Sequence, residues 1–152
     1  MRKALLPRWR DGDRPLPRWA LARPAGDPLT WDIQERGRQA YVVVDGELDV
    51  GTAPDLEKAL TPLAEAGRDL ILDLAGVRFC DCAGLSLFLR VRKHAAAAGG
   101  SLHLAAATKA VSRLITMARL SDILPVTACA ADAIAALDQA ARSGDPAPES
   151  TR

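Results

Sequence analysis

Hydrophobic positions between residues 30 and 142 follow two periods that alternate along the chain. Alternating or continuous apolar runs at residues 31–36, 39–44, 69–74, 101–106 and 124–126 predict five short strands. Apolar residues spaced three and four apart predict four helices, at about 52–66, 82–98, 108–118 and 130–141. Because strands alternate with helices after the first pair, the pairing there should be parallel with right-handed crossovers. The pattern therefore predicts a single α/β domain with a mixed, mostly parallel sheet.

Residues at the predicted helix ends support these boundaries. Thr52 is a candidate N-cap followed by Pro54, and Asp81 is a candidate N-cap of the second helix. Gly67 and Gly99 are placed to end the first and second helices. The stripes expected to face the core are Leu56, Leu60, Leu63 and Ala64; Leu85, Phe88, Leu89 and Val91; Val111, Leu114, Ile115 and Ala118; and Ile134 and Leu137.

Both ends of the chain differ in composition from the predicted domain at residues 30–142. Residues 1–29 contain five of the ten prolines and seven Lys and Arg against three Asp, a net charge of +4. Proline lacks the amide donor that a regular helix needs, so we expect residues 1–29 to form a flexible, basic, proline-rich arm. Trp9 and Trp19, each in a Pro-Arg-Trp repeat, are candidate anchors of this arm on an acidic partner or a membrane. Residues 143–152 are expected to be a disordered tail.

Composition argues against several classes of function. The 20 Lys and Arg nearly balance the 19 Asp and Glu, which argues against general binding to nucleic acid. No apolar run reaches the roughly 18 residues of a membrane span. The chain has three cysteines, an odd number whose spacing fits no disulfide framework, which indicates a reducing, cytoplasmic environment. Two histidines and no glycine-rich phosphate loop predict neither a metal site nor a cofactor.

The turn at residues 79–85 is the strongest candidate for a functional surface. There an apolar strand end meets Asp81, Cys82, Ala83 and Gly84, and a helix follows. Small residues and outward-pointing amides in the first turn suit an approaching protein loop or an anion, although Asp81 could serve as a cap alone. Asp49 follows a neighbouring strand, so the two loops should converge at one sheet edge.

A thiol enzyme built on Cys82 is the competing hypothesis. A helix N-terminus lowers the pKa of a thiol, which makes Cys82 a candidate nucleophile. No general base is predicted beside it, because His94 lies about three turns further along the same helix. The sequence therefore predicts a protein that is not an enzyme.

Three segments, in this order and spacing, resemble the STAS domain family, and within it the bacterial anti-sigma factor antagonists. The first is Gly-Glu-Leu-Asp at 46–49, followed by Thr-Ala-Pro-Asp-Leu at 52–56. The second is the run from residue 70 to 85, and the third is Gly-Gly-Ser-Leu-His-Leu at 99–104, leading to Val-Ser-Arg-Leu at 111–114. The resemblance covers about residues 31–140 and implies a STAS-like single domain.

The resemblance also implies a function. Such proteins bind an anti-sigma factor, usually a serine kinase, and so regulate a sigma factor. Phosphorylation of a Ser or Thr in the turn after the third strand switches that binding off. Asp49 and Asp81 align with acidic residues beside the switch, whereas Ala83 stands at the switch itself and has no hydroxyl.

We therefore predict a binding module whose partner surface contains Asp49, Asp81, Cys82, Ala83 and Gly84. No phosphorylation is expected at Ala83, and Ser86 is the nearest alternative hydroxyl. The alternative hypothesis is a STAS module of another assembly, either stressosome-like or associated with a lipid transporter.

Overall fold

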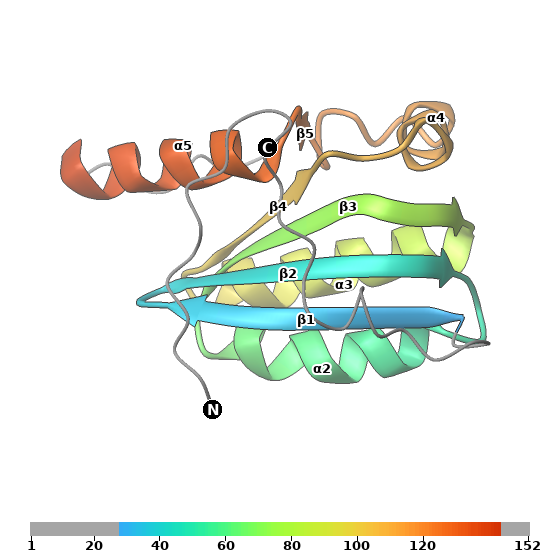
Figure 1. Cartoon of the computed structure of the whole chain (residues 1–152). Helices are drawn as coiled ribbons and strands as arrows, with labels where there is room; N and C mark the ends of the chain where they lie inside the picture. Colours follow the sequence, from blue (N-terminus) through green and yellow to red (C-terminus); the bar gives the residue numbers. More distant parts are fainter. Residues whose placement is uncertain (1–27, 144–152) are drawn as a thin grey trace.

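The computed structural model describes residues 28–143, and residues 1–27 and 144–152 lie outside the described part (Figure 1). The expected arm and tail fall almost wholly on those two segments. In chain order the elements are β1 (Leu29–Arg36), β2 (Gln39–Leu48), α2 (Ala53–Glu65), β3 (Asp69–Cys80), α3 (Cys82–Ala97), β4 (Ser101–Ala105), α4 (Lys109–Met117), β5 (Val126–Thr127) and α5 (Ala130–Ser143). The first strand begins one residue before the expected domain start at 30, and the last helix ends one residue after its expected end at 142.

The five strands form one sheet in the order β1-β2-β3-β4-β5, so neighbours in sequence are also neighbours in space. The hairpin of β1 and β2 is antiparallel, and each later pair is parallel. Parallel neighbours need a crossover, and a helix lies between β2 and β3, β3 and β4, and β4 and β5. This topology confirms the predicted α/β class with a mixed, mostly parallel sheet and four helices in the described residues.

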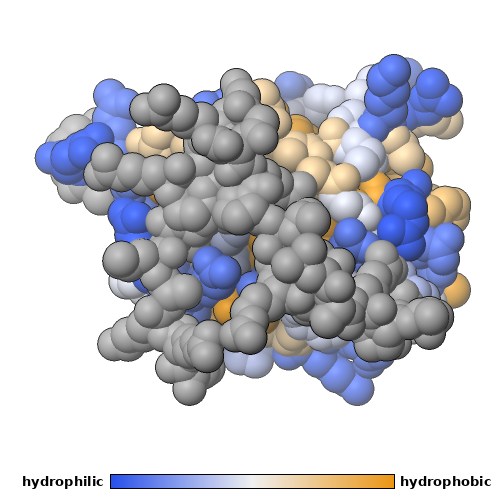
Figure 2. Space-filling model, viewed as in Figure 1, coloured by the Kyte–Doolittle hydropathy of each residue, from blue (hydrophilic) through white to orange (hydrophobic). Residues whose placement is uncertain are grey.

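Alternating side chains of β2 separate two hydrophobic clusters, one on each face of the sheet. Val42 and Val44 belong to the larger cluster, which includes residues of α2, α3 and α4. Tyr41 and Val43 belong to the smaller cluster, which includes residues of α5. Figure 1 accordingly shows α2 and α3 on one side of the sheet and α5 on the other. In the same orientation, Figure 2 shows hydrophilic and hydrophobic described residues interspersed around the visible edge of the molecule.

The predicted apolar stripes supply most of this core, with two corrections. Ala118 is exposed, because it follows the last residue of α4 and caps that helix. Leu87 is fully buried although the predicted stripe of α3 omitted it. The reason is that α3 packs against α2 as well as against the sheet, so its buried surface is wider than one stripe.

β2 and β3 continue well past the ends at residues 44 and 74 that the hydrophobic pattern predicts. The apolar run of β3 ends at Leu74, yet the strand continues to Cys80 and pairs with β2 as far as Leu48. Register shifts after Val43 and after Gly46 allow both strands to continue, but they change which side chains point to each face of the sheet. The last strand is shifted from the predicted 124–126 to Val126–Thr127, since Pro125 has no amide to donate to the ladder.

Gly46 fixes the point where the described chain enters the sheet. Its φ is +124°, and a Cβ there would clash with the carbonyl group of Pro28. The same carbonyl accepts a hydrogen bond from the amide of Glu47 at 2.7 Å. Only glycine tolerates this backbone conformation and this approach, so the start of β1 is held tightly against β2.

Candidate functional site

The loops that carry Asp49 and Asp81 leave the sheet side by side. Leu48 and Cys80 are the last paired residues of β2 and β3, and the amide of Asp81 donates to the carbonyl of Leu48 at 3.1 Å. Figure 1 shows the two arrowheads at the same end of the sheet. The expected convergence of the two loops therefore follows from parallel pairing, which places the carboxyl ends of neighbouring strands at one edge.

Asp49 holds its own loop in place. Its Oδ1 accepts hydrogen bonds from the amides of Gly51 at 2.9 Å and Thr52 at 3.0 Å. The Thr52 hydroxyl donates back to the carbonyl of Glu47 at 2.8 Å and caps no helix amide, although Thr52 occupies the N-cap position of α2. The carboxylate of Asp49 is half-buried and is oriented by these bonds.

Asp81 is the N-cap of α3, as the sequence predicts. Its backbone is extended (φ −115°, ψ −169°), and its Oδ1 accepts from the amides of Ala83 at 2.8 Å and Gly84 at 3.4 Å. Since the side chain occupies these first-turn donors, an incoming anion would have to displace it. Local geometry thus favours a protein surface over an anion site at this helix start.

The three residues after Asp81 differ in exposure. Cys82 is exposed, Ala83 is half-buried against the larger core cluster, and Gly84 is buried. A Cβ on Gly84 would lie 2.5 Å from the Sγ of Cys80 and 3.0 Å from Cγ of Leu48. Gly84 is therefore required for packing, and Cys82 is the member of this trio whose side chain is most accessible to solvent.

The two thiols at this edge have different environments. Burial, and secondarily the charge of Asp81, raises the pKa of Cys80 to about 12, so this thiol stays protonated near neutral pH. The exposed ring of His94 lies twelve residues beyond Cys82, about 18 Å along the helix at 1.5 Å per residue. No base from α3 therefore stands beside Cys82, and the geometry gives the thiol-enzyme hypothesis no support.

Exposed apolar side chains flank both acidic residues. Val50, next to Asp49, is 76% exposed, and Phe79, two residues before Asp81, is 47% exposed. Large apolar side chains on functional loops favour protein contacts. The candidate turn at residues 79–85 includes Phe79, whereas Val50 was not expected at the surface that a partner would use. The available signal was that Val50 lies between the predicted strand and helix, where no period requires an apolar residue.

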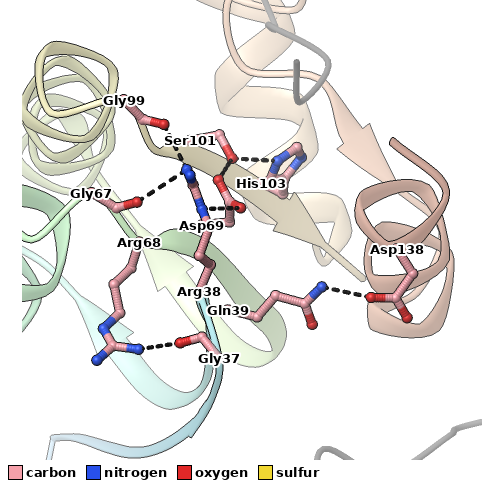
Figure 3. A network of polar contacts seen from close by, with 10 residues as sticks. All are labelled: Gly37, Arg38, Gln39, Gly67, Arg68, Asp69, Gly99, Ser101, His103 and Asp138. Atoms are coloured by element: carbon pink, nitrogen blue, oxygen red, sulfur yellow. Dashed lines mark hydrogen bonds and ion pairs between the residues drawn. The ribbon is translucent and has the colours of Figure 1, made fainter. Parts of the chain in front are cut away.

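A separate polar network lies at the opposite edge of the sheet (Figure 3). The Ser101 hydroxyl donates to Oδ1 of Asp69 at 2.7 Å and lies 2.9 Å from Nε2 of His103. Because its single proton points to Asp69, the hydroxyl accepts from His103, which reverses the direction a nucleophilic serine needs. Burial lowers the pKa of His103, and the charge of Asp69 opposes that shift. The network joins the starts of β3 and β4, and the sequence pattern did not predict it.

Two expected absences can be examined only for residues 28–143. Within that range no helix is long and apolar enough to cross a membrane. The same residues contain no group of three His, Cys, Asp or Glu side chains that could hold a metal ion.

Comparisons with known proteins identify the family. The STAS domain model matches residues 30–133, so the chain belongs to the STAS domain family. The anti-sigma-B factor antagonist of Bacillus subtilis (strain 168) is 36% identical over 97 residues, which cover 64% of this chain and 89% of the relative. The corresponding antagonist of Staphylococcus aureus (strain NCTC 8325 / PS 47) is 36% identical over 86 residues, covering 56% and 80% of the two chains.

Solved structures agree with this assignment. A crystal structure of an anti-sigma factor antagonist from Mycobacterium paratuberculosis has a TM-score of 0.67 and 27% sequence identity, covering 75% of this chain and 97% of that one. The predicted resemblance to the STAS family is therefore confirmed.

Proposed function

We propose that this chain is an anti-sigma factor antagonist, which binds an anti-sigma factor of the serine-kinase type and so regulates a sigma factor. The observation that carries the proposal is the meeting of the Asp49 and Asp81 loops at one sheet edge, beside exposed Val50 and Phe79. The proposed binding surface consists of Asp49, Asp81, Cys82, Ala83 and Gly84. The 36% identity to an anti-sigma-B factor antagonist supports the choice of partner.

The proposed role is binding without catalysis, in the cytoplasm. Cys80, Cys82 and Cys129 are joined by no disulfide, which agrees with a reducing compartment. The buried Cys80 thiol and the absence of a base from α3 beside Cys82 give no nucleophile with an activating partner.

We also propose that phosphorylation does not switch this protein at the family position. The residue that aligns with the phosphorylated Ser or Thr is Ala83, which offers no oxygen. Ser86 is half-buried inside α3, one turn after Asp81, where a phosphate would need the helix surface to rearrange. The binding surface should therefore remain competent whether or not the kinase is active.

Affinity capture from the host organism, followed by mass spectrometry and binding measurements with the purified partner, tests the first proposal. The expected partner is an anti-sigma factor. Asp81→Asn should weaken its binding by about fivefold, or roughly 1 kcal/mol, because the charge is lost while the capping oxygen is kept. Glu65→Gln, at an exposed acidic residue near the end of α2, is the control and should leave the dissociation constant unchanged. Capture of transporter or stressosome subunits instead would contradict the proposal.

Incubation with the captured kinase and ATP tests the absence of the switch. Ala83→Ser should acquire phosphate at position 83, while the wild type acquires none. Ala83→Glu should weaken binding, since two like charges about 4 Å apart repel by on the order of 4 kcal/mol at an effective dielectric near 20, before screening. A quarter of that energy is already about a fivefold loss of affinity. Stoichiometric phosphorylation of the wild type, at Ser86 or elsewhere, with loss of binding would overturn this proposal.

A further inference from the structure

The proposed binding surface is small for a stable complex. Of its five residues, Gly84 is buried and Ala83 is half-buried, so few of its side chains are accessible. Specific protein interfaces bury about 800 Å² and use roughly 20–30 residues on each side. A partner bound at the Asp49 and Asp81 loops must therefore also contact neighbouring elements at this edge of the sheet.

Helix α4 begins at the same edge. The hydroxyl of Thr108, its N-cap residue, donates to the carbonyl of Val77 at 2.9 Å, and α4 contacts β3. Val77 lies in the last turn-ward part of β3, four residues before Asp81. Figure 1 shows α4 at the end of the molecule where the arrowheads of β2 and β3 lie. The start of α4 is therefore a neighbour of the Asp81 loop.

The outer side of α4 is basic and exposed. Val111 and Ile115 are buried in the larger core cluster. Residues four apart follow one another along one side of a helix, so Lys109, Arg113 and Met117 form a stripe on the opposite side. All three are exposed. We call the surface formed by Lys109, Arg113 and Met117 the α4 face.

Positive charge on and beside the α4 face is not neutralised within the described residues 28–143. In that range Lys109, Arg113 and Arg119 form no ion pair. Five arginines elsewhere in the same range lie within 3.5 Å of a carboxylate, namely Arg36, Arg38, Arg68, Arg78 and Arg90. Residues 82–131, from the start of α3 into α5, contain six Lys and Arg against Asp122 alone, a net charge of +5. Uncompensated positive charge of this kind is complementary to an acidic partner.

Met117 adds an apolar contact to the same stripe. Its side chain is 73% exposed. Methionine is flexible and polarisable, so it adapts to partner surfaces. A protein segment with acidic residues beside an apolar one matches this combination. Nucleic acid is a poorer match, because residues 30–152 as a whole carry a net charge of −3, which opposes a polyanion.

We propose that the anti-sigma factor binds across the Asp81 loop and the α4 face together, and that the part of it lying on the α4 face is an acidic segment. This inference rests on the proposed function and specifies the partner's chemistry. The surface is then negative at Asp49 and Asp81 and positive at Lys109 and Arg113. Such a pattern fixes the orientation in which a complementary partner binds.

Binding kinetics with the purified anti-sigma factor test the proposal. The double variant Lys109→Glu with Arg113→Glu should associate about tenfold more slowly than the wild type at about 50 mM salt, and only about twofold more slowly at about 500 mM, because salt screens the charges. The control is Lys58→Glu with Arg142→Glu, which makes the same change of net charge at exposed positions of α2 and α5. The control should change the association rate by less than about twofold.

A neutral variant and a crosslink add readouts that do not depend on charge reversal. Lys109→Gln with Arg113→Gln should associate about threefold more slowly at low salt, since attraction is lost without new repulsion. A carbodiimide joins a lysine amine to a carboxylate in contact with it. In the wild-type complex, mass spectrometry should find Lys109 joined to an Asp or Glu of the anti-sigma factor.

The outcomes separate this inference from the proposed function. If Asp81→Asn weakens binding while both α4 variants associate at the wild-type rate, the inference is wrong and the proposed function stands. A wild type that binds no anti-sigma factor would overturn both. Binding of a DNA duplex at about 150 mM salt that is lost in the double variant would assign the α4 face to nucleic acid and would also overturn the inference.

Discussion

The first turn of α3 should depend on Asp81 in a way that separates hydrogen bonding from charge. Asp81→Ala removes the Oδ1 that accepts from Ala83 at 2.8 Å and from Gly84 at 3.4 Å. The first bond is well formed and the second is long, so the lost cap should cost about 1 kcal/mol. The negative charge at the helix N-terminus contributes about 0.5 kcal/mol more. The expected destabilisation of Asp81→Ala is therefore about 1.5 kcal/mol.

Asp81→Asn is the matched variant, because the asparagine oxygen can accept the same amides while the charge is lost. We expect it to cost only about 0.5 kcal/mol. Urea denaturation followed by circular dichroism measures both values, provided that the slopes against denaturant agree. On heating, the 1 kcal/mol between the variants corresponds to roughly 4 °C in melting temperature for a domain of this size. Equal stabilities of the two variants would refute the capping argument.

Three further predictions concern other parts of the molecule. In urea denaturation, Gly46→Ala should destabilise the protein by about 3 kcal/mol or more, because Gly46 has a φ of +124° and no room for a Cβ. Gly37→Ala should cost only about 1 kcal/mol, because Gly37 has a φ of +56° and open space around it. Burial lowers the pKa of His103 below its ordinary 6.5, so the folded state favours the neutral ring and the free energy of unfolding should fall as the pH drops through 6.5. His103→Gln should lose that part of the pH dependence, and a variant with an unchanged pH profile would contradict this prediction. Iodoacetamide should label Cys82 in the native protein and Cys80 only after unfolding, as mass spectrometry of peptides would show.

Local sequence patterns predicted the type and order of the elements because each pattern reports on its own segment. The four-residue spacing of Leu56 and Leu60 predicts which face of α2 is buried. Asp81 precedes a run of small residues, and this position predicts its role as the N-cap of α3. The same reasoning stops β3 at Leu74, because the alternation changes where the register shifts. The register shift depends on how β3 pairs with β2, which lies some thirty residues earlier in the chain. The hydrophobic period of β3 alone therefore does not reveal it.

Side-chain contacts between distant segments were the least predictable part of the molecule. Asp69 and Ser101 are the first residues of two strands separated by a helix, and only parallel pairing in register brings them together. The direction of the Asp49 carboxylate was also not predictable, since Thr52 was the expected cap of α2. In the structure, Asp49 binds the amides of the loop, and the hydroxyl of Thr52 turns back to the preceding strand.

Both acidic residues of the proposed surface are oriented by backbone amides of their own loops, and this bears on regulation. Asp81 cannot rotate away from an added charge without releasing the amide of Ala83, at a cost of about 1 kcal/mol. A phosphate on a hydroxyl at position 83 would therefore act on the helix start as well as on the partner. Ala83 cannot receive that phosphate, so both the cap and the charge of this surface are expected to stay constant. Control of binding is then expected to depend on the amount of the protein or on access to its surface, and not on a change at the start of α3.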